Sequence, residues 1–244
     1  MDKDMMTIRD RIAEWISEKV GESKAGGVVV GLSGGVDSSV VAALAKLAVG
    51  DKVLGLIMPC QSIEEDTEHA HMLAKKFKIK TEFVDLEPVY KRLKQSLPPG
   101  KGIADANLKP RLRMLTLYYF ANLHNYLVLG TGNKSELMIG YFTKYGDGGV
   151  DLLPIAGLYK HQIRELAGIL GIPDVIIKKP PSAGLWKGQT DEGEIGMTYD
   201  ELDRTLQAIE KNETRGIDPE KLGKVKNMIK ISEHKRKLAE IFRP

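Results

Sequence analysis

Residues 28–49 constrain the fold of this chain more than any other stretch. Three adjacent valines lead into the glycine-rich "GLSGGVDSS" and then into the apolar helical pattern "VVAALAKLAV". A short run of β-branched residues between glycines predicts a strand that is covered on both faces. A buried strand, a glycine loop and a helix in succession begin a βαβ unit, so we expect a parallel sheet.

The rest of the chain repeats this alternation of strand and helix. Further strands are predicted at "KVLGLIMP", "IKTEFVDL" and "YLVLG", with helical patterns between them. We also expect an amphipathic first helix, a helix starting at Pro110, one from about Lys160 to Leu170, and two closing helices. The predicted fold is α/β: a doubly wound, mostly parallel sheet with helices on both faces, in one domain spanning 1–244.

Composition narrows the class of protein. No run approaches the roughly 18 apolar residues of a membrane helix, and the first residues are unlike a signal peptide, so we expect a cytoplasmic protein without membrane contact. Cys60 is the only cysteine, which excludes an intramolecular disulfide and paired-thiol chemistry. The formal charge is +3, and the basic stretch 221–237 holds no aromatic residue for base stacking, so we favour a solvated face over nucleic-acid binding.

The loop "GLSGGVDSS" has the outline of a phosphate loop, yet it contains no lysine. A plain strand-to-helix turn, with Gly35 at a positive φ and Asp37 or Ser38 as helix cap, is the structural alternative. Two adjacent glycines flanked by hydroxyls exceed what a turn needs, so we favour an anion site. Phosphate repels a carboxylate unless a cation intervenes, and Asp37 therefore predicts Mg²⁺.

Polar residues also follow other predicted strands, at the sheet edge where ligands bind. Glu136, in the first turn after "GTGNK", is the candidate for a second carboxylate, although an acid there also stabilises a helix dipole. Lys160, at the start of a helix, is a candidate for the positive charge that the loop lacks.

Two arginines follow Pro110 on one predicted helix. Arg111 borders the expected apolar stripe, whereas Arg113 lies further round, so only Arg111 is expected to reach a covered site. A stem packed on the core rim, with its head in water, is the alternative for Arg111. The expected stripe consists of Leu108, Leu112, Leu115 and Tyr119.

Two further segments have the composition of ligand-binding loops. "YFTKYGDGGVDLLPIAGLYK" sets Lys144, Asp147 and Asp151 around three glycines, although solvated turns have a similar composition. The Pro/Gly/Ser-rich stretch over about 178–198 has no regular pattern, which predicts a mobile lid or a disordered segment.

Together these stretches resemble the ammonia-dependent NAD synthetase family of the ATP pyrophosphatase superfamily. "SGGVDSS" is similar to the superfamily's signature, and the narrower match, in the family's order, consists of "GTGNKSE", "GYFTKYGDGGVDLLPIAGLYK", "KKPPSAGLW", "QTDEGEIGMTYDELD" and "SEHKRK". Two departures stand out. The bacterial pattern often has "GTDHAAE" in place of "GTGNKSE", and "PCQSIEED" lacks an arginine that some members use on ATP.

The resemblance implies a role for each matching residue. ATP would be bound by Gly31, Leu32, Ser33, Gly34, Gly35, Val36, Asp37, Ser38, Thr131, Lys160 and Ser182, and Mg²⁺ by Asp37 and Glu136. The second substrate, deamido-NAD, would be bound by Arg111, Lys144, Asp151, His234 and Lys235, with Asp147 near the ammonia path.

The implied reaction adenylates the nicotinate carboxylate of deamido-NAD and then amidates it with ammonia, giving NAD, AMP and pyrophosphate. Free ammonia is the implied donor, and a separate glutaminase that supplies it stays open. The family resemblance also implies a homodimer, for which Trp15 and Ile16 on the first helix are candidate interface residues. Two alternatives stay open: a tRNA-modifying ATP pyrophosphatase, and a nucleotide-binding subunit without turnover.

Overall fold

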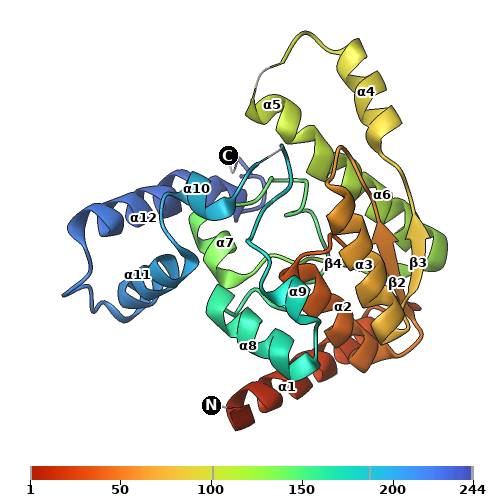
Figure 1. Cartoon of the computed structure of the whole chain (residues 1–244), viewed down its shortest axis with the longest axis horizontal. Helices are drawn as coiled ribbons and strands as arrows, with labels where there is room; N and C mark the ends of the chain where they lie inside the picture. The colour runs from red at the N-terminus through yellow and green to blue at the C-terminus, as the bar shows by residue number, and fades with distance from the viewer. Residues whose placement is uncertain (1, 101, 187, 243–244) are drawn as a thin grey trace.

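The protein contains one parallel sheet wrapped by helices (Figure 1). The structure is a computed structural model that describes residues 2–100, 102–186 and 188–242. Its strands are β1 (Gly27–Gly31), β2 (Val53–Ile57), β3 (Lys80–Phe83) and β4 (Tyr126–Leu129). The helices are α1 (Asp2–Glu22), α2 (Val36–Val49), α3 (Glu64–Phe77), α4 (Glu87–Ser96), α5 (Ile103–Ala106), α6 (Leu108–His124), α7 (Lys134–Ile139), α8 (Lys160–Leu170), α9 (Asp174–Ile177), α10 (Asp191–Ile195), α11 (Tyr199–Lys211) and α12 (Pro219–Ile231), followed by the 3₁₀ turn Glu233–Lys235.

The strands lie in the order β3-β2-β1-β4, and every pair is parallel. The chain builds outward from β1 through β2 to β3, then returns to place β4 on the other side of β1. In the central register, Val29 lies between Leu54 of β2 and Val128 of β4. The order reverses between β1 and β4, and such a switch point opens a crevice beyond the carboxyl ends of the strands.

Helices cover both faces of the sheet, which confirms the predicted fold class. Val28 and Val30 belong to a core that includes side chains of α1, α2 and α8, whereas Val29 packs with residues of α4 and α6 on the opposite face. All three valines are fully buried, because alternate residues of a strand point to opposite sides and both sides are covered. The valine run is therefore explained by burial on two faces.

A third apolar cluster joins α7 to α11 and α12, which lie together at one end of the molecule (Figure 1). Its centre holds Ile139 of α7, Tyr199 and Leu206 of α11, and Val225 of α12. Thr198 caps α11 by accepting a hydrogen bond from the Glu201 amide, as its place before a helical pattern favours. The cluster holds the C-terminal helices against the segment that follows β4.

The predicted face of α6 was right at its start and wrong further along. Leu112 lies in the core and Leu108 packs against it, but Leu115 and Tyr119 are each 64% exposed, while Leu117 and Ala121 are buried instead. Apolar residues occupy both sides of this helix, so periodicity alone did not choose between them. The helix also begins at Leu108, two residues before the predicted start at Pro110.

Two smaller expectations are corrected. The segment over 178–198 is not irregular throughout, because α10 forms within it, with Thr190 accepting the Gly193 amide as its N-cap. Ile16 of α1 is fully buried against the main core, which removes it as an interface candidate. Among the described residues, no helix is both long enough and apolar enough to cross a bilayer.

Candidate active site

A cavity of about 410 Å³ opens beyond the carboxyl ends of β1, β2 and β4. Its size suits a small-molecule ligand. The loop after β1, the start of α6 and the segment before α10 all contribute to its wall. The predicted site residues that line it are Gly31, Leu32, Ser33, Gly35, Val36, Asp37, Ser38, Thr131, Glu136, Asp147, Lys160, Ser182 and Lys235.

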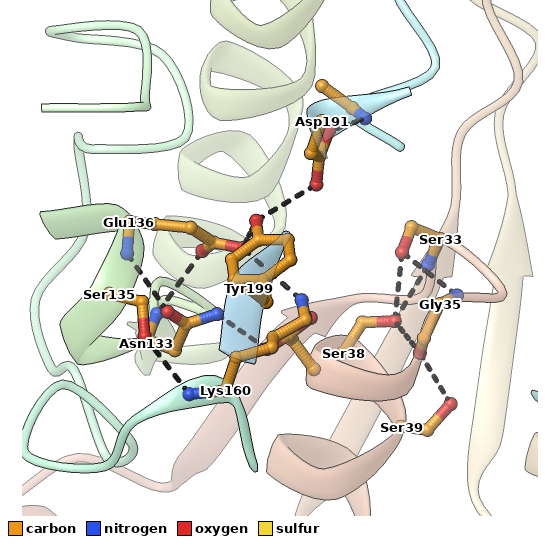
Figure 2. A network of polar contacts seen from close by, with 12 residues as sticks. Ser33, Gly35, Ser38, Ser39, Asn133, Ser135, Glu136, Lys160, Asp191 and Tyr199 are labelled. Carbon is orange, nitrogen blue, oxygen red and sulfur yellow. Dashed lines mark hydrogen bonds and ion pairs between the residues drawn. The ribbon is translucent and has the colours of Figure 1, made fainter. Parts of the chain in front are cut away.

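The loop after β1 is held by its own hydroxyl groups. The Ser38 hydroxyl donates to the Gly35 carbonyl oxygen at 3.0 Å, and the Ser33 amide donates to Ser38 Oγ at 3.3 Å (Figure 2). Gly34 has a φ of +77°, and a Cβ there would lie 2.2 Å from the Asp66 carbonyl oxygen, so only glycine fits. Gly35 is the N-cap of α2 and no side chain caps the helix. The helix-cap alternative for Asp37 and Ser38 was therefore wrong.

Asp37 takes part in a buried network of charges instead. Its Oδ2 lies 2.5 Å from Lys160 Nζ, and its Oδ1 accepts a 2.9 Å hydrogen bond from Asn133 Nδ2. Lys160 Nζ also lies 3.4 Å from Glu136 Oε1, and only 2% of the Lys160 side chain is exposed. Asn133, Glu136 and Lys160 converge on one point in Figure 2. The network joins residues that follow β1 and β4, on the two sides of the switch point.

Glu136 serves two purposes. Its Oε2 accepts the Asn133 amide at 3.3 Å while Asn133 Oδ1 accepts the Glu136 amide, forming a capping box at the start of α7. Its Oε1 faces Lys160. The helix-terminus interpretation and the charge-site interpretation of Glu136 therefore both hold, one for each carboxylate oxygen.

The crowding of charges shifts their protonation. Burial raises the pKa of Glu136 to about 8, and the nearby Asp37 charge raises it while Lys160 lowers it. Burial lowers the pKa of Lys160, but the Asp37 and Glu136 charges outweigh burial and keep that pKa above its usual value. Lys160 therefore stays a cation at neutral pH, and the Glu136 carboxylate gains strongly from any further positive charge nearby.

A buried aspartate positions Lys160. Asp203 of α11 accepts hydrogen bonds from the Ser135 hydroxyl and, at 3.0 Å, from the His161 amide. Ser135 Oγ in turn accepts the Lys160 amide at 3.0 Å. His161 Nδ1 lies 2.8 Å from Asp203 Oδ2. Because Ser135 donates to the aspartate rather than to the histidine, this serine, aspartate and histidine do not form a nucleophilic triad; they anchor the first turn of α8.

More acidic groups lie on the far side of Lys160. Tyr199 OH donates toward Asp191 Oδ2 at 3.1 Å and toward Glu136 Oε1 at 3.3 Å, and Lys160 Nζ lies 4.9 Å from the Tyr199 ring centroid (Figure 2). Asp191 also accepts the Ala183 amide at 2.9 Å, and burial raises its pKa. Our sequence interpretation did not identify Asp191, Tyr199 and Asp203 as site residues, and no sequence pattern marks them. It also missed Asn133, which the capping pattern from Asn133 to Glu136 could have indicated.

Asp37 and Glu136 are the two carboxyl groups at this place that could share a magnesium ion with phosphate, since Mg²⁺ is bound in proteins by one or two carboxylates plus phosphate oxygens. In the structure both of them contact Lys160 Nζ. Within the described residues, no group of three or more His, Cys, Asp or Glu side chains is arranged to hold a metal on its own. The remaining ligands would have to come from the bound nucleotide and water.

The outer rim of the cavity is held by cations that contact backbone carbonyl groups. Lys235 Nζ donates to the carbonyl oxygens of Gly140 at 2.7 Å and Phe142 at 2.8 Å, which closes the end of α7. Lys144 Nζ donates to the His234 carbonyl at 2.6 Å. Of these predicted substrate residues, Lys235 lines the cavity, whereas Lys144 and His234 are not part of its lining.

Asp147 lies on the cavity wall, and its place near an ammonia path stays a prediction. Its Oδ1 accepts the Thr143 amide at 2.9 Å, and burial raises its pKa. Asp151 lies outside the cavity lining, where it accepts hydrogen bonds from Tyr118 OH at 2.9 Å and the Val128 amide at 2.8 Å. The structure does not bring Asp151 to the other site residues.

The expectation for the two arginines was wrong. Arg113 lines the cavity, whereas Arg111 is exposed and donates to the Lys144 carbonyl at 3.4 Å on the outer side. The cause is the misassigned face of α6, because the helix turns its Leu117 side to the core. A contact of Arg111 with substrate stays a prediction.

A doubly wound parallel sheet, with a lysine-free anion loop and an Asp-Lys-Glu group at its switch point, places this protein in the adenine nucleotide alpha hydrolase-like class. Within that class the chain belongs to the NAD synthase family, whose model matches residues 8–239.

Similar proteins agree with this placement. An NH(3)-dependent NAD(+) synthetase from Carboxydothermus hydrogenoformans is 51% identical over 95% of each chain. Among solved structures, an NMN synthetase from Francisella tularensis is 36% identical with a TM-score of 0.89, covering 97% of this chain and 98% of that one. An NH3-dependent NAD synthetase from Campylobacter jejuni is 33% identical with a TM-score of 0.87, covering 98% and 99%.

Proposed function

We propose that this protein is an NH3-dependent NAD synthetase, which uses ATP to convert the nicotinate carboxylate of deamido-NAD into the amide of NAD. The observation that carries the proposal is the Asp37-Lys160-Glu136 group beside the anion loop, in a chain of the NAD synthase family. A loop without its own lysine, supported by a lysine from a distant helix, suits a reaction in which pyrophosphate is the leaving group.

In the first step, an oxygen of the nicotinate carboxylate attacks the α-phosphorus of ATP. The bond between the α-phosphorus and the bridging oxygen breaks, and the electron pair leaves with pyrophosphate. Lys160 and the amides at the start of α2 stabilise the negative charge that grows on this leaving group. Thr131 and Ser182 also line the cavity; the Ser182 hydroxyl, which donates to the Gln189 carbonyl at 2.8 Å, would exchange that partner for a phosphate oxygen. Mg²⁺, held by Asp37 and Glu136, would neutralise further charge on the same phosphates.

In the second step, ammonia attacks the acyl carbon of the adenylate, and AMP leaves. Ammonium must lose a proton before it can attack, and we assign this proton to Asp147. A carboxylate with a raised pKa is a better base than an ordinary one, and burial raises the pKa of Asp147. The Thr143 amide holds its Oδ1, which leaves Oδ2 for the proton.

The acid that is amidated could also be a mononucleotide instead of deamido-NAD, since one of the similar solved structures is an NMN synthetase. An enzyme that makes NMN by amidation acts on the acid of the mononucleotide, which lacks the adenosine half of deamido-NAD. The rim segment around Lys235 is the part of the cavity wall that we assign to the larger substrate. We therefore expect the mononucleotide acid to be the poorer substrate.

The test is an assay of NAD and pyrophosphate with ATP, Mg²⁺, ammonium and either deamido-NAD or the mononucleotide acid. We expect stoichiometric NAD, AMP and pyrophosphate, with a higher kcat/KM for deamido-NAD. A higher kcat/KM for the mononucleotide acid would make the protein an NMN synthetase. Product formed only when tRNA is present would support the tRNA-modifying alternative, and ATP binding without turnover of either acid would support a non-catalytic subunit.

We also propose that the protein is a homodimer, joined through α6. Leu115, Tyr119 and Leu123 form one exposed stripe, each being at least 60% accessible. Their spacing of four residues puts them on one side of the helix, which a second copy of the chain would cover. Light scattering after size exclusion should give a dimer, and a Leu115→Glu/Leu123→Glu variant should give a monomer. Leu47→Glu, at an equally exposed leucine on α2, is the control.

A further inference from the structure

Arg113 is a partly buried cation in the cavity wall to which the mechanism above gives no role. Its Nε donates to the Met58 carbonyl at 3.2 Å and its Nη2 to Ser62 Oγ at 3.3 Å. Both partners belong to the segment that follows β2, so the arginine crosses from α6 to the end of a neighbouring strand. No carboxylate lies within ion-pair distance of it among the described residues.

Lys160 lies between two carboxyl groups, whereas Lys109 donates to the Leu185 carbonyl at 2.7 Å with the Tyr90 ring 5.5 Å away. A guanidinium has five N–H donors, and Arg113 uses only two of them on neutral oxygens. Burial lowers the pKa of Arg113, and the charges of Asp147 and Asp66 raise it without direct contact. A partly desolvated cation with no carboxylate in contact is costly, and one that lines a ligand cavity is explained if the ligand supplies the anion.

The position of Arg113 in the cavity indicates which anionic group of the ligand it binds. The Asp37-Lys160-Glu136 group, assigned above to the leaving pyrophosphate, lies between the ends of β1 and β4. Arg113 lies at the end of β2, on the opposite side of β1, in the same cavity. The segment 58–66 contains no lysine or arginine of its own, and Lys179, which also lines the cavity, is paired with Asp66 at 2.5 Å. Arg113 of α6 is therefore the cation beside this segment that contacts neutral oxygens and is left to bind a ligand's anion.

We propose that Arg113 binds the α-phosphate of ATP and keeps hold of it, through the acyl-adenylate, until AMP leaves. The proposal rests on the adenylation chemistry proposed above. The planar guanidinium can donate two parallel hydrogen bonds to the non-bridging phosphate oxygens, a geometry that an ammonium group does not reproduce. Met58 and Ser62 fix the plane of the guanidinium, so its free N–H groups are oriented before the nucleotide arrives.

Binding of AMP and of pyrophosphate, measured separately by calorimetry in the presence of Mg²⁺, tests this assignment. Arg113→Gln should weaken AMP binding by about tenfold to a hundredfold, since a charge-assisted hydrogen-bonded pair is lost, and should change pyrophosphate binding by less than about twofold. Arg113→Lys should lie between the wild type and Arg113→Gln. Arg92→Gln, at an exposed arginine of α4, should leave both affinities unchanged.

Two results would overturn the proposal. An unchanged AMP affinity with a raised KM for deamido-NAD would move Arg113 to the carboxylate of the acyl acceptor. Unchanged affinities with a lowered melting temperature, reproduced by Ser62→Ala, would make Arg113 a purely structural link between α6 and the segment after β2. If Arg113→Gln does not fold, the Arg113→Lys comparison decides alone.

The same measurements separate this proposal from the proposed function. AMP binding that depends on Arg113, in a protein that makes no NAD, would leave the phosphate assignment standing and contradict the synthetase activity. NAD synthesis with AMP binding that ignores Arg113 would do the reverse.

Discussion

The inner wall and the outer rim of the cavity hold their charged groups in different ways. At the inner wall, Lys160 is paired with the charge of Asp37 and also contacts the carboxyl group of Glu136. At the rim, Lys235 contacts the carbonyl oxygens of Gly140 and Phe142, which are dipoles without net charge. The inner cation is therefore matched by carboxylates, whereas the rim cation keeps its full positive charge.

The difference corresponds to two tasks. Chemistry at the phosphates needs groups that are already in place, and a network of mutually bonded side chains provides that order. Recognition of a second anionic substrate needs unpaired positive charge on a segment that can yield as the substrate enters.

Asp37→Asn should have the largest effect. Asparagine keeps the shape and can still accept the Asn133 hydrogen bond, but it removes the charge from the inner wall. We expect kcat/KM for ATP to fall at least about a thousandfold, with the melting temperature close to that of the wild type, because Lys160 retains Glu136. Near-normal pyrophosphate release would contradict the role of the inner network in catalysis.

Glu136→Gln should raise the stability of the ligand-free protein at pH 8. In the folded protein Glu136 has a pKa of about 8 and keeps its proton, whereas in the unfolded chain it loses that proton near its ordinary, lower pKa. The stability of the wild type therefore falls as the pH rises between these two values. Glutamine removes this dependence. We expect the variant to match the wild type at pH 5 and to exceed it at pH 8 by roughly 1 to 3 kcal/mol, given about 1.4 kcal/mol per pKa unit.

Urea unfolding at both pH values measures the difference. The variant should lose activity at either pH, which separates stability from function at this residue. Equal pH slopes for the variant and the wild type would mean that Glu136 is ionised in the free protein.

Ending the chain before Ser232 should act mainly on the rim. The cut removes Lys235, Ser232, whose Cβ would lie 2.1 Å from a Cβ on Gly140, and Arg236, which donates to the Leu137 and Met138 carbonyls at the end of α7. We expect KM for deamido-NAD to rise about tenfold, which corresponds to the loss of roughly one charge-assisted contact, and KM for ATP to change much less. A chain ending after Lys237, which keeps these contacts, is the control. An unchanged KM would return the basic C-terminal stretch to the solvated-face interpretation.

Lys109→Met should have the smallest effect. Methionine fills the space of the lysine stem but cannot donate to the Leu185 carbonyl, so the segment before α10 loses one tether. We expect hydrogen exchange over 182–190 to be faster by about fivefold to tenfold, in line with about 1 kcal/mol for a hydrogen bond, with little change elsewhere. Lys94 is an exposed lysine that also lies over the Tyr90 ring but is paired with Asp105, so Lys94→Met should leave exchange in this segment unchanged.

Much of this fold could be predicted because short, local sequence patterns determine its strands and loops. The valine run of β1 and the glycines after it encode a buried strand and a loop without help from the rest of the chain. The face of α6 could not be predicted, since Leu115 and Leu117 are equally apolar and only the packed sheet selects between them. That one error moved the expected contact from Arg113 to Arg111.

The candidate site divides in the same way. Asp37 and Glu136 could be proposed from the residues beside a loop and a helix start, because each lies next to a recognisable pattern. Asp191 and Asp203 could not, since their partners lie on elements that only the folded chain brings together. A short acidic stretch looks the same in sequence whether it is solvated or buried against tyrosines.

The distance along the chain between Asp37 and Lys160 determines when the protein can become active during folding. The two residues are 123 positions apart, and β4 must join β1 before they can meet. A growing chain therefore cannot assemble the network until α8 has been made, however early β1 and α2 take shape. Recovered activity in a refolding experiment would accordingly report the last long-range docking event, and no fragment that ends before α8 should regain any of it.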